Sequence, residues 1–367
     1  MKQTNETQNG SAIVIGASLS GLMTAIALAR EGIHVKVLEK VGSDHRSGSG
    51  LQVDAAGFHA TGTEQLLRNL ASGGRRSIQL WSSIESRLRK EVDGDSKIEI
   101  RYNTRVELIQ QNETSAWVET MGGDVIQADI IIGADGHHSL VRRHVSPNNP
   151  EAKFAGYMVW IASTNEDVLP EYMRPRNKHP EVTMLDSLNG FLFGSIINSL
   201  DTTDNRRIGC TWYDNSRNDL LRSLGCVEGN VVNHSLKGPD IPGETLSELA
   251  AVVSSRWEDP WKSAMLHALQ TRSITGTPIK EYLPDVLVKG RVALIGDAAH
   301  VPAPITASGF NTSLQDAVEL GKCVANGVHG NAAITALKKY ESERLNCVRD
   351  MVQSGKSYSR SFGLSSD

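Results

Sequence analysis

The chain has 367 residues, of which 39% are hydrophobic and 22% are charged, and its formal net charge is −4. This is a globular composition with room for two domains, and it argues against a nucleic-acid partner or a basic membrane-binding patch. The polar N-terminus lacks a signal-peptide pattern and no apolar run is long enough to span a bilayer, so we expect a cytoplasmic protein. The four cysteines are scattered without metal-binding spacing, which predicts reduced thiols and no metal site.

The chain opens with the pattern of a βαβ unit. "AIVIGA" is a short apolar run that is rich in β-branched residues and ends at its glycine, which predicts a buried parallel strand. Apolar residues at helical spacing predict a helix over 19–30 that Gly32 ends, and "IHVKVLEK" predicts the next strand. A unit of this kind is typical of dinucleotide-binding folds.

The next segment is rich in glycine and serine and predicts one helix near 64–70, followed by a longer helix over 78–90. Strand patterns return in "KIEIRYN" and "RVELIQQ", then in a hairpin that turns at residues 122–124. "DIIIGAD" predicts a further buried strand that ends in polar residues.

The character of the chain changes near Phe154, where short alternating or aromatic strands predict an antiparallel sheet with helices near 247–255 and 261–270. "RVALIGDAAH" resumes the buried-strand pattern, and the last part of the chain is mostly helical. We therefore expect an α/β protein with a Rossmann-like nucleotide-binding domain, an inserted antiparallel-sheet domain and a helical C-terminal region. The expected boundaries are 11–150, 151–280 and 281–367.

The loop "GASLSG" follows the first strand and resembles the G-x-G-x-x-G phosphate loop. Gly16 permits the tight turn, Gly21 lets the helix pack close to the sheet, and Ser18 replaces the second glycine. Glu39 ends the second strand, where a carboxylate accepts hydrogen bonds from ribose hydroxyls and disfavours a 2′-phosphate. FAD and NAD both fit this loop, and a purely structural turn is the alternative.

Two distant motifs favour FAD. "GADGHHSLVRR" places Asp135 after one buried strand, and "GRVALIGDAAH" places Asp297 after another. Since ligands of open α/β sheets bind outside the carboxyl ends of the strands, we expect both to converge on Gly16. Asp297 suits ribityl hydroxyls, and the helix entry at 304–311 suits the flavin pyrimidine ring. Each aspartate alone has a structural alternative as a helix cap or turn residue.

Together these motifs resemble the fingerprints of the FAD-dependent aromatic hydroxylases, the para-hydroxybenzoate hydroxylase class. "FAGYMVW" and "GCTWYD" are similar to the 2,6-dihydroxypyridine hydroxylase-like branch. The resemblance implies a noncovalent FAD, reduced by NADH or NADPH, whose C4a-hydroperoxide formed with O2 hydroxylates a small aromatic or N-heterocyclic phenol. It therefore implies an FAD-dependent monooxygenase, a monomer or homodimer, in which the cofactor carries the chemistry and no catalytic triad is needed.

The resemblance also implies a set of cofactor-binding residues, grouped by the part of FAD they contact. They are Gly16, Ser18, Leu19 and Gly21 at the pyrophosphate, Glu39 with Lys40 at the adenosine ribose, Val106 at the adenine, Asp135 and Gly136 at FAD and pyridine nucleotide, Asp297 at the ribityl chain or pyrophosphate, Pro304, Gly309, Phe310 and Asn311 at the isoalloxazine, and Gly50 and Leu51 near the flavin.

The sequence departs from the family pattern at two places. Ala307 and Ser308 replace the usual Gly-Gln beside the site of oxygen reaction, where a methyl group crowds the flavin if the backbone needs positive φ. The segment 50–74 is short, so the arginine expected at a phosphate is not aligned; the candidates are Arg46, Arg75 and Arg76. These departures motivate two alternatives: an FAD-dependent reductase or oxidase without oxygen insertion, and a non-catalytic FAD-binding protein.

We expect the substrate between the flavin and the antiparallel sheet. The aromatic candidates are Tyr157, Trp160, Phe191, Phe193, Trp212 and Tyr213, each with core packing as the alternative. Strand alternation puts Trp212 and Tyr213 on opposite faces, so they do not both contact a ligand. For His300 we favour a structural hydrogen bond over a role as base, and we name no catalytic side chain.

Overall fold

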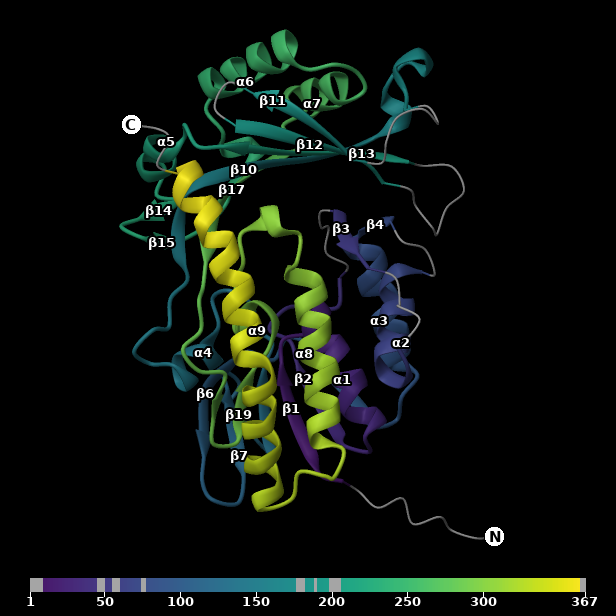
Figure 1. The fold of residues 1–367 in the computed structure, drawn as a ribbon, viewed down its shortest axis with the longest axis vertical. Helices are drawn as coiled ribbons and strands as arrows, with labels where there is room; N and C mark the ends of the chain where they lie inside the picture. The colour runs from purple at the N-terminus through teal and green to yellow at the C-terminus, as the bar shows by residue number, and fades with distance from the viewer. Residues whose placement is uncertain are drawn as a thin grey trace.

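The structure is a computed structural model that describes residues 9–44, 50–54, 60–73, 77–175, 182–187, 190–197 and 206–363. Figure 1 shows an elongated molecule in which a parallel-sheet unit lies below an antiparallel sheet, with the long helix α9 (Asn331–Gly363) running between them. None of the described helices is long and apolar enough to cross a membrane. The α/β class and the inserted sheet predicted from the sequence are confirmed.

The lower unit is built on a six-stranded sheet of order β18-β19-β9-β1-β2-β5. Its strands are β1 (Ser11–Ile15), β2 (His34–Leu38), β5 (Ile98–Arg101), β9 (Ile130–Gly133), β18 (Val288–Lys289) and β19 (Val292–Leu294). All neighbours except β18 pair in parallel, and Ile15 is in register with both Leu38 and Gly133. Because Gly133 also pairs with Leu294, the segments that follow β1, β2, β9 and β19 leave the sheet at one edge.

Helices and a small sheet cover this core. They are α1 (Leu19–Arg30), α2 (Gly62–Ser72), α3 (Trp81–Asp93), α4 (Leu140–Val145), α8 (Gly309–Val324), β6 (Val106–Gln111), β7 (Ala116–Thr120) and β8 (Val125–Ala128). Helix α1 is buried along nearly its whole length and packs against α8, which explains its almost uniformly apolar sequence.

The upper unit is a six-stranded, antiparallel sheet of order β11-β12-β13-β10-β17-β16. The strands are β10 (Lys153–Asn165), β11 (Val182–Ser187), β12 (Gly190–Ile197), β13 (Arg207–Asp214), β16 (Leu236–Lys237) and β17 (Ile274–Glu281). Helices α6 (Gly243–Arg256) and α7 (Trp261–Gln270) cover one face (Figure 1). The remaining pieces are α5 (Asn218–Ser223), β14 (Val227–Glu228), β15 (Val231–Val232) and the 3-10 turns η1 (Glu166–Val168), η2 (Glu171–Met173) and η3 (Gly238–Asp240).

One predicted element is wrong in part. Residues 77–80 form strand β4 (Ser77–Leu80), which pairs with β3 (Gly50–Val53), and the helix predicted over 78–90 begins at Trp81. The pairing leaves so little room at Gly50 that an added Cβ atom would lie 2.6 Å from a methyl carbon of Ile78. Residues 78–80 therefore form a strand that pairs with β3, although their periodicity favours a helix.

Candidate active site

The loop after β1 has the geometry of a phosphate site. Gly16 has φ of +104°, and a Cβ atom there would lie 2.5 Å from the carbonyl oxygen of Ala134. A Cβ atom on Gly21 would lie 1.9 Å from the carbonyl oxygen of Gly16, so both positions require glycine. Ser18 is the N-cap residue of α1, yet its side chain makes no capping hydrogen bond. Its hydroxyl and the N–H groups of the first turn of α1 are therefore open to an anionic ligand.

Glu39 holds this loop from the end of β2. Its buried carboxylate accepts hydrogen bonds from the backbone N–H groups of Ala17 (2.9 Å) and Val41 (3.1 Å). The N–H group of Thr104 donates to the carbonyl oxygen of Glu39, which brings the start of β6, with Val106, beside it. Lys40 is exposed at the same edge. Glu39 thus shapes the loop itself, a role that its place in the sequence did not predict.

Asp135 takes the structural role that the sequence left open as an alternative. Its carboxylate accepts hydrogen bonds from the N–H groups of Leu140 (2.7 Å) and Val141 (3.2 Å) and from the Ser139 hydroxyl, so it caps α4. Burial raises the pKa of this carboxyl despite these donors. The adjacent Gly136 has φ of +78°. Contact of these two residues with a nucleotide stays a prediction.

Arg142 joins the second motif to the third. Its guanidinium is fully buried, lies 4.2 Å from the ring centre of Tyr282, and donates to the carbonyl oxygens of Asp297 and Ala298 at 3.1 Å each. It also donates to the carbonyl oxygens of Pro150 and His137. No pattern in the sequence had singled out this residue, which links the two motifs.

Asp297 lies on the short turn η4 (Gly296–Ala298), directly against α1. Gly296 has φ of +55°, and a Cβ atom there would lie 2.8 Å from the Cβ atom of Ser20 in the first turn of α1. The Asp297 side chain is exposed, and among the described residues nothing donates a hydrogen bond to its carboxylate. Desolvation by the surrounding protein raises the pKa of this carboxyl, although the nearby charges of His300 and Lys280 act to lower it. An accessible carboxylate with unused acceptors fits the hydroxyl groups of a ribityl chain.

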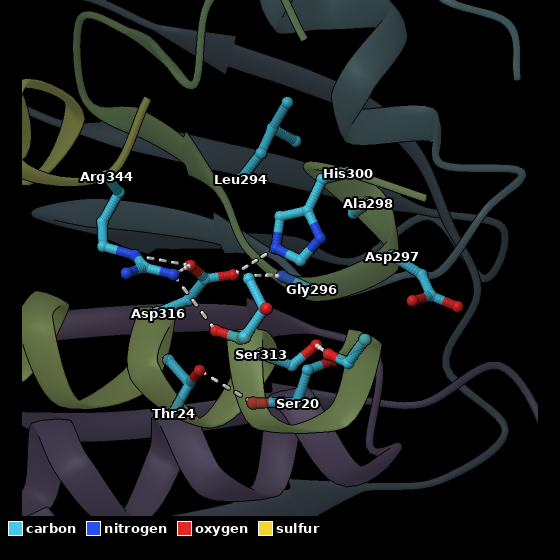
Figure 2. A network of polar contacts seen from close by, with 12 residues as sticks. Ser20, Thr24, Leu294, Gly296, Asp297, Ala298, His300, Ser313, Asp316 and Arg344 are labelled. Atoms are coloured by element: carbon cyan, nitrogen blue, oxygen red, sulfur yellow. Dashed lines mark hydrogen bonds and ion pairs between the residues drawn. The ribbon is translucent and has the colours of Figure 1, made fainter. Parts of the chain in front are cut away.

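A buried polar network fixes this turn from behind (Figure 2). The Asp316 carboxylate, on α8, accepts from the Gly296 N–H group (3.0 Å), lies 2.7 Å from His300 Nε2, and accepts from Arg344 Nε on α9 (2.8 Å). Burial opposes ionisation of Asp316, but His300, Arg344 and the Gly296 N–H group hold the pKa of its carboxyl below the ordinary value. Figure 2 shows the Asp297 side chain turned away from this network. His300 therefore has a structural hydrogen bond.

The segment before α8 provides a second open helix end. After the turn η5 (Pro304–Thr306), Ala307 has φ of +48°, and α8 begins at Gly309 with no side-chain cap from Ser308. Asn311 accepts from the N–H group of Asp54 (3.3 Å) and donates to the carbonyl oxygen of Gln52 (3.4 Å). These bonds bring β3, with Gly50 and Leu51, beside the start of α8, where Phe310 is buried.

An aromatic cluster lies on the face of the upper sheet opposite α6 and α7, where α9 packs against β10. It comprises Tyr157, Phe191, Phe193, Tyr213, Tyr358 and Phe362, and Ile305 of η5 packs against it. Phe191 stacks on Tyr213 with ring centres 4.7 Å apart. The two aromatic residues that α9 contributes were not predicted. Trp160 and Trp212 lie on the opposite face, where Trp212 contacts Trp257.

The structure thus brings the phosphate loop, Glu39, Asp297 and the start of α8 to one edge of the parallel sheet, opposite the aromatic cluster. Three predicted or candidate arginines, Arg46, Arg75 and Arg76, lie outside the described residues.

Comparisons with known proteins agree with this arrangement. The family model described as "FAD binding domain" matches residues 10–70 and 243–355. "Monooxygenase 1" of Arabidopsis thaliana is 26% identical over 87% of this chain and 80% of its own length. The "FAD-dependent urate hydroxylase" of Klebsiella oxytoca is 25% identical over 93% of this chain and 87% of its own length.

The solved structure of 2,6-dihydroxypyridine-3-hydroxylase from Arthrobacter nicotinovorans has the same fold. It superposes with a TM-score of 0.77 at 21% identity, over 97% of this chain and 93% of that one. The matched residues include the phosphate loop, Asp297 and the start of α8, which the structure assembles at one sheet edge. The chain is therefore similar to FAD-dependent aromatic hydroxylases over most of its length, and its first and last parts match an FAD binding domain.

Proposed function

We propose that this chain is an FAD-dependent monooxygenase that hydroxylates a small planar aromatic or N-heterocyclic phenol, with NADH or NADPH as electron donor. The observation that carries the proposal is the convergence of the phosphate loop, Asp297 and the start of α8 opposite the aromatic cluster. The urate hydroxylase among its relatives acts on a heterocycle of this size, which supports the substrate class. When bound, FAD supplies the redox chemistry with pyridine nucleotide and oxygen.

The residues of the chain bind and orient the reactants. The open first turns of α1 and α8 both present N–H groups and the positive end of a helix dipole, α1 toward phosphate and α8 toward negative charge on the flavin pyrimidine ring. Asp297 accepts hydrogen bonds from the ribityl hydroxyls. The partly exposed rings of Phe191 and Phe193 in the aromatic cluster offer apolar surface that packs against a planar ring and keeps water away from it.

A substrate panel tests this proposal. Purified protein reconstituted with FAD is assayed for NADH and NADPH oxidation with phenols, pyridinols and urate, and products are analysed by mass spectrometry under ¹⁸O₂. We expect at least one substrate to accelerate pyridine-nucleotide oxidation and to gain one labelled oxygen atom. Bound FAD with no oxygenated product from any panel member contradicts the monooxygenase proposal.

A second candidate is an FAD-dependent reductase or oxidase that does not insert oxygen. Ala307 supports it, because its exposed methyl group lies on backbone at positive φ in the segment where oxygen is expected to react. Hydrogen peroxide formed in equal amount to the NADH consumed, without hydroxylated product, favours this candidate. Turnover of either kind excludes a non-catalytic FAD-binding protein. The cytoplasmic location and the monomeric or homodimeric state stay predictions.

A further inference from the structure

Lys280 acts on Asp297 through its charge, but no ligand has been assigned to it. It is the next-to-last residue of β17, and its ammonium nitrogen lies 3.4 Å from Nε2 of His138 in the loop after β9. The ring of His138 in turn contacts that of His137, with centres 4.5 Å apart. Among the described residues, no carboxylate forms an ion pair with Lys280. We call these three residues the Lys280 cluster.

The cluster lies beside the proposed nucleotide site. The charges of Asp297 and Arg142 both act on Lys280, and that of Lys40 acts on His137. Arg142 is already engaged with backbone carbonyl oxygens, including that of His137. The loop that carries the two histidines begins after Ala134, whose carbonyl oxygen borders Gly16 in the phosphate loop.

The electrostatics of the cluster favour an anion. Burial lowers the pKa of Lys280 to about 8, while burial, with the positive charge of Lys280, lowers the pKa of His137 to about 3. At neutral pH the cluster therefore holds a cationic lysine beside a neutral histidine. A half-buried ammonium without a carboxylate partner is unfavourable, and an anion placed against it removes that cost.

We propose that Lys280, together with His138, binds a phosphate group of a nucleotide. A lysine ammonium is a common phosphate ligand. Because this ammonium donates to Nε2 of His138, the ring carries its N–H group on Nδ1, and that group donates a second hydrogen bond. The phosphate belongs either to FAD or to the pyridine nucleotide, since both carry a pyrophosphate. This inference rests on the proposed function for the identity of the two nucleotides, but the cluster itself does not depend on turnover.

Lys280→Gln tests the proposal against Lys289→Gln, which removes an exposed lysine whose ammonium bonds the carbonyl oxygen of His144. Calorimetric titration of each apoprotein with inorganic pyrophosphate gives its affinity for a free pyrophosphate, and the difference between wild type and Lys280→Gln reports the share of the cluster. FAD binding is followed by flavin fluorescence, and NADH or NADPH binding by stopped-flow reduction of the FAD-loaded protein. Circular dichroism confirms that each variant is folded.

We expect Lys280→Gln to weaken pyrophosphate binding about tenfold or more, the range for a lost charged hydrogen bond. Weaker FAD binding assigns the phosphate to FAD, and weaker pyridine-nucleotide binding with unchanged FAD affinity assigns it to the electron donor. Lys280→Arg keeps the charge and retains most of the affinity.

The wild-type affinity for pyrophosphate also falls as the pH rises through about 8, because Lys280 loses its proton, and the variant lacks this fall. The groups near the ammonium are His137, His138, Asp297 and Arg142, and both proteins contain all four. The proposal is overturned if Lys280→Gln binds pyrophosphate, FAD and the pyridine nucleotide with dissociation constants that are all within twofold of those of the wild type and of Lys289→Gln. Because pyrophosphate binding needs no substrate, failure of the hydroxylation assay leaves this result unaffected.

Discussion

Replacing Asp316 by asparagine tests the buried network behind Asp297. The carboxylate is fully buried and its partner Arg344 is 10% exposed. Asparagine has one acceptor oxygen, so it can accept either from Arg344 or from the Gly296 N–H group and His300, but not from both. It also leaves the Arg344 guanidinium without a counter-charge. Breaking a buried ion pair in this way costs about 3–5 kcal/mol of the free energy of unfolding.

Urea unfolding followed by tryptophan fluorescence measures this cost, with Asp285→Asn as the matched control. Asp285 is 61% exposed and lies 3.5 Å from the half-exposed Arg349, so its loss costs at most about 1 kcal/mol. A cost for Asp316→Asn within about 1 kcal/mol of that control refutes the reasoning. Because the folded-state pKa of Asp316 is lowered, its contribution is present above the unfolded value and is lost only as the pH falls through the lowered one. The difference from wild type is therefore constant near neutral pH and shrinks only in strong acid.

Three further substitutions test the loops. Ala307→Gly relieves a left-handed backbone strain of about 1 kcal/mol but adds freedom to the unfolded chain, so the urea midpoint stays level or rises slightly; a clear fall contradicts the assigned strain. Gly21→Ala places a Cβ atom 1.9 Å from the Gly16 carbonyl oxygen, and we expect fluorescence titration to show FAD affinity at least about tenfold weaker; unchanged affinity rules out the loop as the phosphate site. Ser18→Gly removes a side chain that caps nothing, so the same titration finds FAD affinity kept or slightly raised, and complete loss of binding means that the loop is misassigned.

The sequence predicted the parts of the fold that depend on local patterns. The bounds expected for α1 match the structure because its apolar spacing, the phosphate loop and Gly32 lie within one short segment. The helix expected over 261–270 also has the observed bounds. The convergence of Gly16 and Asp297 followed from a general rule about strand ends, which needs no knowledge of the packing.

The features that escaped prediction join segments far apart in the chain. Asp316 and Arg344 look like surface charges on two amphipathic helices, and only the packing of α8 on α9 buries them together. The pairing of β3 with β4 likewise depends on a partner distant in sequence, so local periodicity favoured a helix there. Asp135 was correctly predicted to follow a buried strand. Whether it caps a helix or binds a ligand depends on the position of α4, which the local sequence does not determine.

Helix α9 connects the two units, because it packs against α8 in the lower unit and against β10 in the upper one. Its Arg344 pairs with Asp316, which accepts from the Gly296 N–H group in the turn that carries Asp297, and its Tyr358 contacts other rings of the aromatic cluster. These two anchors are 14 residues apart, which at 1.5 Å per residue is about 21 Å of continuous helix. We therefore expect α9 to set the distance between the proposed FAD site and the aromatic cluster, so that a bulkier substrate is admitted by rotation of ring side chains rather than by separation of the two units.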